Sequence, residues 1–128
     1  MSAPTPDRER DLDVSLPAPG IYRGSHYTQW TVKVRRLLRE ARLDEAVALL
    51  NELIDAVESE DDLTGTGVAP WYYAQLALTH RRRRRLDEEI AVLERFAARP
   101  RTARSPGTPP LRRRLDQARV LRAMRDAG

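Results

Sequence analysis

The sequence predicts an all-α protein in which antiparallel helix pairs stack side by side and a C-terminal helix caps the stack. Apolar residues recur at intervals of three and four in five segments, whereas no segment alternates with a period of two. The chain also repeats itself, because Leu43-Asp44-Glu45 recurs as Leu86-Asp87-Glu88 at a shift of 43 residues. Such a repeat is typical of helix pairs that stack to share a core.

The N-terminal segment differs in composition from the rest of the chain. Residues 1–19 contain four of the nine prolines and no apolar periodicity, which predicts a disordered tail. Residues 20–128 are then expected to form one helical domain, since a chain of 128 residues suffices for a single modest core. The aromatic-rich residues 20–30 are expected to pack on the first helix.

The predicted helices form two pairs and a cap. The first pair covers about residues 27–58. The second pair begins at Pro70, which is a favourable residue in the first turn of a helix, and continues to about residue 99. The capping helix covers about residues 109–126. The apolar stripes of the five helices are, in order, Trp30, Val34, Leu37 and Leu38; Leu43, Ala46, Val47, Leu50, Leu53, Ile54 and Val57; Tyr73, Leu76, Ala77 and His80; Leu86, Ile90, Leu93, Phe96 and Ala97; and Leu111, Leu115, Ala118, Leu121 and Met124.

A run of five arginines, Arg81 to Arg85, is the most conspicuous charged feature. The repeat places it where Arg39 to Arg42 stand in the first pair, at the end of one helix and in the tight turn before the next. A solvated helix corner explains the run, because cations interact favourably with the carbonyl end of a helix. Binding of phosphates or of an acidic peptide is the alternative.

The charge distribution keeps that alternative open. Residues 1–79 carry 8 Lys/Arg and 13 Asp/Glu, whereas residues 80–128 carry 15 and 6, so the two parts have net charges of −5 and +9. This division is expected either to mark a face for an acidic partner or to let two copies attract each other head to tail. For nucleic acid, the candidate residues are Arg81, Arg82, Arg83, Arg84, Arg85, Arg112, Arg113 and Arg114. Only weak binding is expected there, because no nucleic-acid module accompanies them.

The helix pairs resemble the tetratricopeptide repeat, a two-helix unit of about 34 residues, as in helical repeat proteins of bacterial type. Trp30 and Tyr73 match its bulky residue early in the first helix, and Ala77 matches the small residue at the helix crossing. In the turn and the second helix, the matching residues are Leu43, Leu86, Ala46, Leu50 and Leu93. The resemblance covers about residues 27–101 and implies a short right-handed superhelix. The larger spacing implies an insertion of about nine residues near residues 60–68.

The resemblance also implies a function, namely peptide binding along the inner surface of the first helix of each pair. An acidic peptide with apolar anchors suits that surface. The expected partner-binding residues are Arg35, Leu38, Trp71, Leu78, Arg81 and Arg82.

No pattern in the sequence indicates a reaction, a cofactor or a metal. There is no cysteine, and His26 and His80 lack metal-ligand spacing. We therefore expect a non-catalytic protein–protein interaction module, an adaptor without catalytic, cofactor or metal-binding residues. No segment is long and apolar enough for a membrane span, so a cytoplasmic location is expected. Self-association is a further possibility, since two repeats leave apolar edges uncovered.

Overall fold

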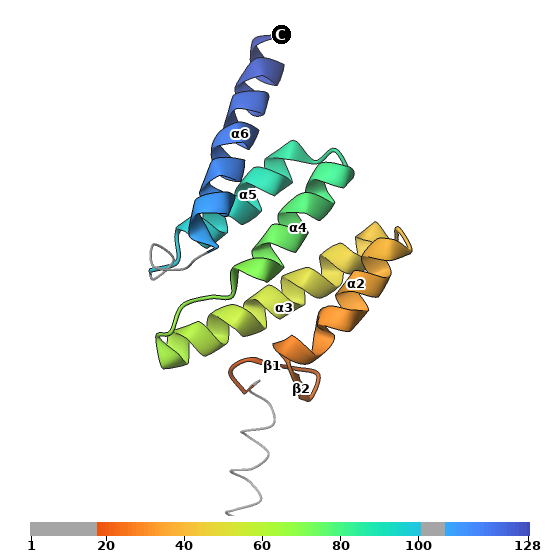
Figure 1. Cartoon of the computed structure of the whole chain (residues 1–128), viewed down its shortest axis with the longest axis vertical. Coiled ribbons are helices and arrows are strands. Elements are labelled where there is room, and N and C mark those ends of the chain that lie inside the picture. Colours follow the sequence, from red (N-terminus) through yellow and green to blue (C-terminus); the bar gives the residue numbers. More distant parts are fainter. Residues whose placement is uncertain (1–17, 101–106) are drawn as a thin grey trace, which may run out of the picture.

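The computed structural model describes residues 18–100 and 107–128, and in these ranges the chain is all-α, as predicted (Figure 1). Five α-helices follow a short 3-10 helix, η1 (Tyr27–Trp30): α2 (Thr31–Arg39), α3 (Leu43–Thr64), α4 (Pro70–Arg82), α5 (Leu86–Ala97) and α6 (Thr108–Ala127). None of the helices in the described ranges is both long and apolar enough to cross a membrane. The predicted tail falls almost entirely on residues 1–17, which lie outside the described residues.

A small antiparallel hairpin precedes the helices, and the expectation of no strand is wrong here. Strand β1 (Ile21–Tyr22) pairs with β2 (Ser25–His26). Arg23 and Gly24 form the connection with φ angles of 48° and 83°, the left-handed pair that a tight hairpin turn requires. Strands of two residues are too short to show a period of two, so the sequence pattern could not reveal them.

The hairpin and η1 are anchored mainly on α3, and not only on the first helix as expected. The backbone N–H of Gly20 donates to Oγ of Ser59 over 3.1 Å, and Nε2 of His26 lies 2.6 Å from Oε2 of Glu60. Tyr27 donates its hydroxyl to the other oxygen of Glu60 over 3.2 Å. Burial, together with the Glu60 carboxylate, raises the pKa of Tyr27 to about 12, so the phenol keeps the proton that it donates.

The α2–α3 and α4–α5 turns have the same backbone structure at a shift of 43 residues. Ala41 and Arg84 occupy equivalent left-handed positions, with φ angles of 58° and 59°. The next residue of each turn donates its N–H to the carbonyl five residues earlier, over 2.9 Å at Arg42 and 2.8 Å at Arg85. This hydrogen bond closes the Schellman motif that ends many helices. Each pair of helices therefore reverses direction in the same way.

Helix α4 lies in the middle of the molecule and contributes to both sides of the core (Figure 1). It packs against α3 on one side and against α5 on the other, and α6 then covers α5. The predicted stripe of α4 is buried throughout, with Tyr73 and Ala77 fully inaccessible. On α5, Ile90, Leu93 and Phe96 are buried as predicted, whereas Ala97 is exposed at the end of the helix.

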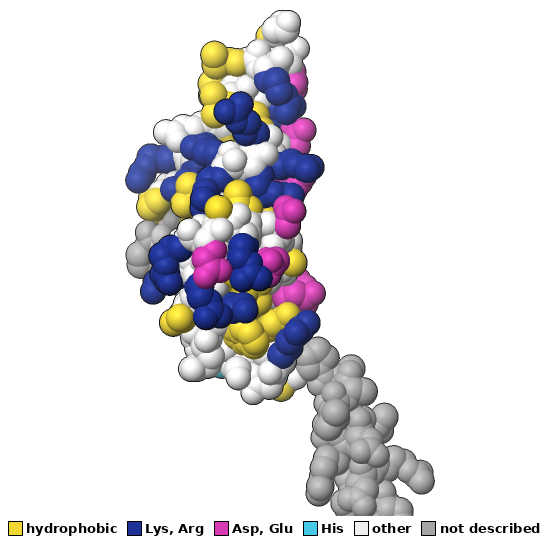
Figure 2. All heavy atoms as spheres, turned by 90° about the vertical axis from the view of Figure 1, so that its right-hand side faces the viewer, with side chains coloured by type: hydrophobic (Ala, Val, Ile, Leu, Met, Phe, Trp, Pro, Cys, Tyr) yellow, Lys and Arg dark blue, Asp and Glu magenta, His cyan; other side chains and the backbone are white. Residues whose placement is uncertain are grey.

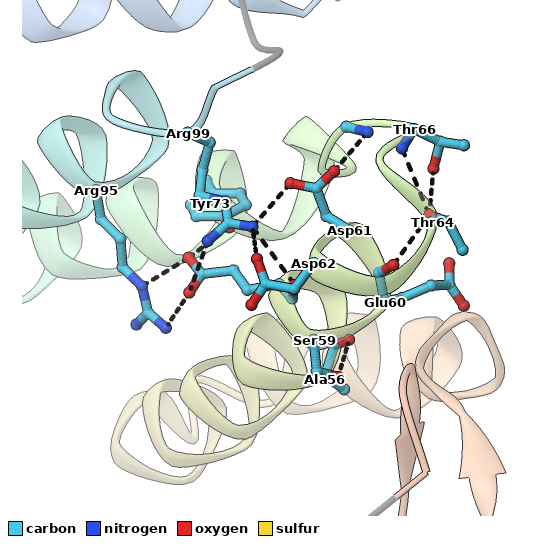
Figure 3. A network of polar contacts seen from close by, with 12 residues as sticks. Ala56, Ser59, Glu60, Asp61, Asp62, Thr64, Thr66, Tyr73, Arg95 and Arg99 are labelled. Atoms are coloured by element: carbon cyan, nitrogen blue, oxygen red, sulfur yellow. Dashed lines mark hydrogen bonds and ion pairs between the residues drawn. The ribbon is translucent and has the colours of Figure 1, made fainter.

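Helix α3 continues to Thr64, about two turns beyond the predicted end near residue 58. Arg95 of α5 and Arg99, just past the end of that helix, pair with acidic residues in this part of α3 (Figure 3). Arg95 donates to Glu58 over 2.8 Å, and Arg99 donates to the buried carboxylate of Asp61 over 2.8 Å. Acidic residues near the carbonyl end of a helix are unfavourable without such partners. The helix ends at Gly65, which takes the left-handed conformation with φ of 70°.

Helix α6 runs antiparallel to α5 and covers it with only part of its predicted stripe. Arg119 pairs with Glu94 and Arg125 with Asp87, so the end of α6 lies beside the start of α5. The early stripe residues Leu111, Leu115 and Ala118 are buried, but Leu121 and Met124 are 47% and 66% exposed. The prediction that these two residues are covered is wrong, because the 20-residue α6 extends beyond the 12-residue α5 (Figure 1).

The left-handed turn residues lead to a first prediction. Substituting Ala41→Gly or Arg84→Gly removes a strain of about 1–2 kcal/mol. Glycine's greater freedom in the unfolded chain offsets about 0.5–1 kcal/mol of that gain. We expect each variant to unfold at higher urea concentration, with a net gain of about 0.5–1 kcal/mol. The matched control is Ala48→Gly on the exposed side of α3, which should lose about 0.5–1 kcal/mol. Destabilisation by Ala41→Gly would contradict the turn geometry.

The two leucines of α6 lead to a second prediction. Leu115 is buried, so Leu115→Ala removes apolar contacts with the core and should lower the free energy of unfolding by about 2–5 kcal/mol. Leu121→Ala makes the same chemical change on the exposed side of the same helix and should change it by less than about 0.5 kcal/mol. Chemical denaturation of both variants measures the difference, and equal losses would show that the distal part of α6 is covered.

Candidate partner-binding face

Helices α2 and α4 lie parallel and form a common face. Near their first turns, the rings of Tyr27 and Tyr72 meet edge to face with centroids 5.2 Å apart. At their ends, Nη1 of Arg82 donates to the carbonyl oxygen of Leu38 over 3.3 Å. Contacts at both ends fix the relative direction of the two helices. The neighbouring helices therefore carry five of the residues that the sequence predicted to bind a partner, namely Arg35, Leu38, Trp71, Leu78 and Arg82.

The centre of this face is a cation–π contact. The guanidinium carbon of Arg35 lies 5.4 Å from the ring centroid of Trp71. Trp71 is half-buried and held in place by an edge-to-face contact with Tyr72 at 4.9 Å. Among the ion pairs of residues 18–100 and 107–128, none involves Arg35. Its N–H donors therefore stand beside an aromatic surface without a carboxylate of their own.

An apolar stripe on the outer side of α4 ends at a cation. Trp71, Ala74, Leu78 and Arg82 follow one another at intervals of three and four, so they share one side of the helix. Leu78 is 36% exposed, and Leu38 of α2 is half-buried opposite this stripe. A ligand lying along the face would meet an aromatic ring and a guanidinium at one end and a leucine and a second guanidinium at the other.

Arg81 has a different environment from the other predicted residues. Its Nε donates to Oε1 of Glu89 over 3.3 Å, and its Nη2 lies 2.9 Å from Oε2 in ion-pair contact without hydrogen-bond geometry. The Glu89 carboxylate is only 1% exposed. A buried carboxylate needs a cation nearby, because its desolvation is otherwise costly. Arg81 therefore holds the fold together at this position as well as bordering the face.

The remaining arginines of the run form the α4–α5 turn. Arg83 lies 3.1 Å from Asp44 of α3, and Arg85 lies 3.3 Å from Glu88. Arg84 is the exposed left-handed residue of the turn. Figure 2 shows the side of the molecule on which both turns lie in Figure 1, and acidic side chains stand among the basic ones there. The geometry is that of a charged helix corner with internal partners.

The second arginine cluster lies far from the first. Arg112 borders a cavity of about 200 Å³ with Phe96 and Ala97, at the last turn of α5. The run from Arg81 to Arg85 precedes the first turn of α5. Because α5 has 12 residues, the helix separates the two clusters by about 18 Å along its axis. The eight arginines assigned to nucleic-acid binding therefore do not form one continuous strip.

Neither histidine is arranged as a free acid or base. His80 is buried between α4 and α5, and this burial lowers its pKa, against the opposing effect of the Glu88 carboxylate 3.4 Å away. His26 contacts Glu60 through one ring nitrogen and the hydroxyl of Thr28 through the other, at 2.6 and 2.9 Å. Both rings are thus engaged within the fold. Among the described residues, no group of three His, Cys, Asp or Glu side chains is placed to hold a metal ion.

Several important residues were missed by the sequence reasoning. Arg95 and Arg99 clamp the end of α3, and Glu89 is a buried charge on α5. A signal for the clamp does exist in the sequence. Arg95 on α5 and Arg99 just after it are four residues apart, and Glu58, Asp61 and Asp62 follow a similar spacing on α3. Figure 3 shows Arg99 beside Asp61 and Asp62.

Comparison with known proteins finds no relative of this chain. No protein-family model matches the chain, and no curated protein or solved structure matches it significantly.

Proposed function

We propose that the protein is a non-catalytic interaction module of tetratricopeptide-like architecture, and that its α2–α4 face binds an acidic peptide with apolar anchors. The equivalent turns at Ala41 and Arg84 and the parallel run of α2 and α4 support this architecture. In such an array, the first helix of each pair contributes one side to a shared surface. The second helix of each pair is then left to hold the stack together.

The contact between Arg35 and Trp71 carries the proposal. An arginine over an indole ring has its charge partly desolvated and its orientation fixed, which reduces the entropy lost when it binds a carboxylate. Trp71 and Leu78 supply apolar area on the same face. Aromatic and arginine side chains in half-buried positions are the residues that dominate binding energy in protein interfaces. An acidic residue of the ligand would meet Arg35 or Arg82, and an apolar residue would lie between them.

The ion pairs of the arginine run favour this proposal over nucleic-acid binding. Affinity for nucleic acid depends on protein cations that neutralise phosphates and so release the counterions condensed on the nucleic acid. Arg81, Arg83 and Arg85 already lie beside Glu89, Asp44 and Glu88, so a phosphate would have to compete with these carboxylates.

Peptide binding provides the third prediction. A peptide that alternates Asp or Glu with Leu or Phe should bind the full chain and alter Trp71 fluorescence. We expect Arg35→Glu to weaken binding about 10- to 100-fold, which corresponds to a charge-assisted hydrogen bond of about 1.5–3 kcal/mol. Titration by fluorescence or calorimetry measures the affinity.

The matched control for this prediction is Arg36→Glu. It makes the same charge change on the same helix, at an exposed position on the side away from Leu38. We expect it to weaken binding by less than about threefold, since an exposed charge without direct contact contributes little. An equal loss in both variants would mean that the peptide responds to net charge only, and the specific face would be refuted.

Nucleic-acid binding provides the fourth prediction. If all five arginines of the run met phosphates, the slope of log K against log salt concentration for duplex DNA would be about −4. We expect a shallower slope and weak, sequence-independent binding, because three of these arginines have acidic neighbours within the fold. Fluorescence anisotropy over a series of salt concentrations measures it. Tight binding at physiological salt that is lost when Arg81 to Arg85 become serine would overturn the assignment.

A further inference from the structure

Helix α2 carries basic residues that the fold leaves without acidic partners. Its nine residues include four cations and no acidic residue, the cations being Lys33, Arg35, Arg36 and Arg39. None of these four takes part in an ion pair within residues 18–100 and 107–128. Arg35 and Arg39 are exposed and four residues apart, so they stand one above the other along α2. The α2–α4 face therefore has a cationic edge that is open to a partner.

The two edges of this face have spacings that describe a ligand. Along α4, the apolar residues from Trp71 to Leu78 cover about 10 Å, since a helix rises by 1.5 Å per residue. Along α2, the step from Arg35 to Arg39 is about 6 Å. An extended chain advances about 3.3 Å per residue and turns successive side chains to opposite edges. A fitting ligand is therefore an extended segment with two carboxylates two residues apart on one edge and apolar side chains on the other.

The N-terminal segment of the chain, outside the described residues, contains this pattern. Residues 11–16 read Asp-Leu-Asp-Val-Ser-Leu, so polar and apolar side chains alternate and no basic residue intervenes. The expectation that no segment alternates with a period of two is wrong for these six residues. In an extended conformation, Asp11 and Asp13 stand about 7 Å apart on one edge, while Leu12 and Leu16 stand about 13 Å apart on the other. Both spacings suit the two edges of the α2–α4 face.

The described chain begins at the end of the molecule where this face starts. Figure 1 shows the β1–β2 hairpin beside the start of α2. The carbonyl of Gly20 accepts from the N–H of Tyr27 over 2.9 Å, and the Tyr27 ring contacts Tyr72, whose ring contacts Trp71. The four residues from Leu16 to Gly20 span up to about 13 Å when extended. Leu16 can therefore reach the Trp71 end of the face, with the residues before it running along α4.

We propose that residues 11–16 occupy the α2–α4 face of their own chain as an extended segment. The two aspartates lie along Arg35 and Arg39, and the three apolar residues lie along the stripe from Trp71 to Leu78. The inference rests on the proposed peptide-binding function, because it names the segment of this chain that has the proposed ligand's chemistry. A segment on a short flexible linker has an effective concentration on the order of 1 mM at its site. The segment is therefore an internal competitor that weakens the binding of other acidic peptides.

The first test measures peptide affinity in full chains with altered N-terminal segments. Asp11→Lys combined with Asp13→Lys should release the segment. If the segment alone binds with a Kd of about 0.1 mM, a tether at about 1 mM leaves about a tenth of the faces free, so release should tighten binding of the alternating acidic peptide about 10-fold. Asp7→Lys combined with Glu9→Lys is the matched control, with the same charge change outside the segment, and should change the affinity less than about threefold. Arg35→Glu should weaken peptide binding more in the released chain than in the wild-type chain, because Arg35 holds both ligands.

The second test locates the segment without any added peptide. The chain has no cysteine, so Ser15→Cys gives a single attachment site for a nitroxide, at the one residue of the segment that is neither acidic nor apolar. The nitroxide should broaden the NMR signals of the Trp71 and Leu78 amides. Arg35→Glu should reduce this broadening, and Arg36→Glu should leave it unchanged. When nitroxide-labelled chains are mixed with isotope-labelled chains that carry no nitroxide, the signals should stay sharp, because the contact lies within one chain.

The outcomes distinguish this inference from the peptide-binding function. Sharp Trp71 signals beside the nitroxide, with equal peptide affinity in the released and wild-type chains, would overturn the inference, while an Arg35-dependent affinity would still support the face. Failure of every chain to bind the peptide would refute the proposed function, and the nitroxide would then decide whether the segment lies on the face. Broadening in the mixed sample would assign the segment to the face of a second copy and overturn a contact within one chain.

Discussion

The burial of α4 on two sides is the constraint on which the rest of the structure depends. Tyr72, Tyr73, Leu76 and Ala77 are all buried in the core, where the Tyr73 ring contacts Phe96 of α5 and its hydroxyl donates to Glu58 of α3, so only one stripe of α4 is left exposed. That stripe contains Trp71, Leu78 and Arg82. The candidate binding face is therefore what remains of a helix after packing has used every other side. The chain reverses at the α2–α3 turn and again between Thr64 and Pro70, so α4 runs parallel to α2.

Ion pairs between elements stabilise the charged parts of this stack. The acidic residues at the end of α3 would repel one another and the carbonyl end of the helix dipole, but Arg95 of α5 and Arg99 just after that helix lie against them. The arginines of the α4–α5 turn in turn lie beside Asp44, Glu88 and Glu89. Three of the eight arginines assigned to nucleic-acid binding, Arg81, Arg83 and Arg85, are thus ion-paired inside the fold. Arg35 has no such ion pair among the described residues and lies over the Trp71 ring, so it is better placed to bind a partner.

The sequence predicted the helical class, the five helices and the turn position of the arginine run because each depends on local periodicity and on the 43-residue repeat. It also placed Arg35, Trp71 and Leu78 on neighbouring helices. It failed where pairing over a distance decides the outcome. The extension of α3 to Thr64 depends on Arg99, about 38 residues away from Asp61. The exposure of Leu121 depends on where α5 ends, which an apolar stripe on α6 alone cannot indicate.

Where helix pairs stack, the outer side of the first and last helices has no neighbouring pair to cover it. At the N-terminal end, the hairpin and η1 cover part of α3 through Ser59 and Glu60. At the C-terminal end, α6 covers α5 and then carries apolar residues past it, with no further helix among the described residues to receive them. The apolar end of α6 is therefore left uncovered by the described part of the chain, whereas the charges beside it are paired within the fold, because Arg119 and Arg125 lie against Glu94 and Asp87 of α5.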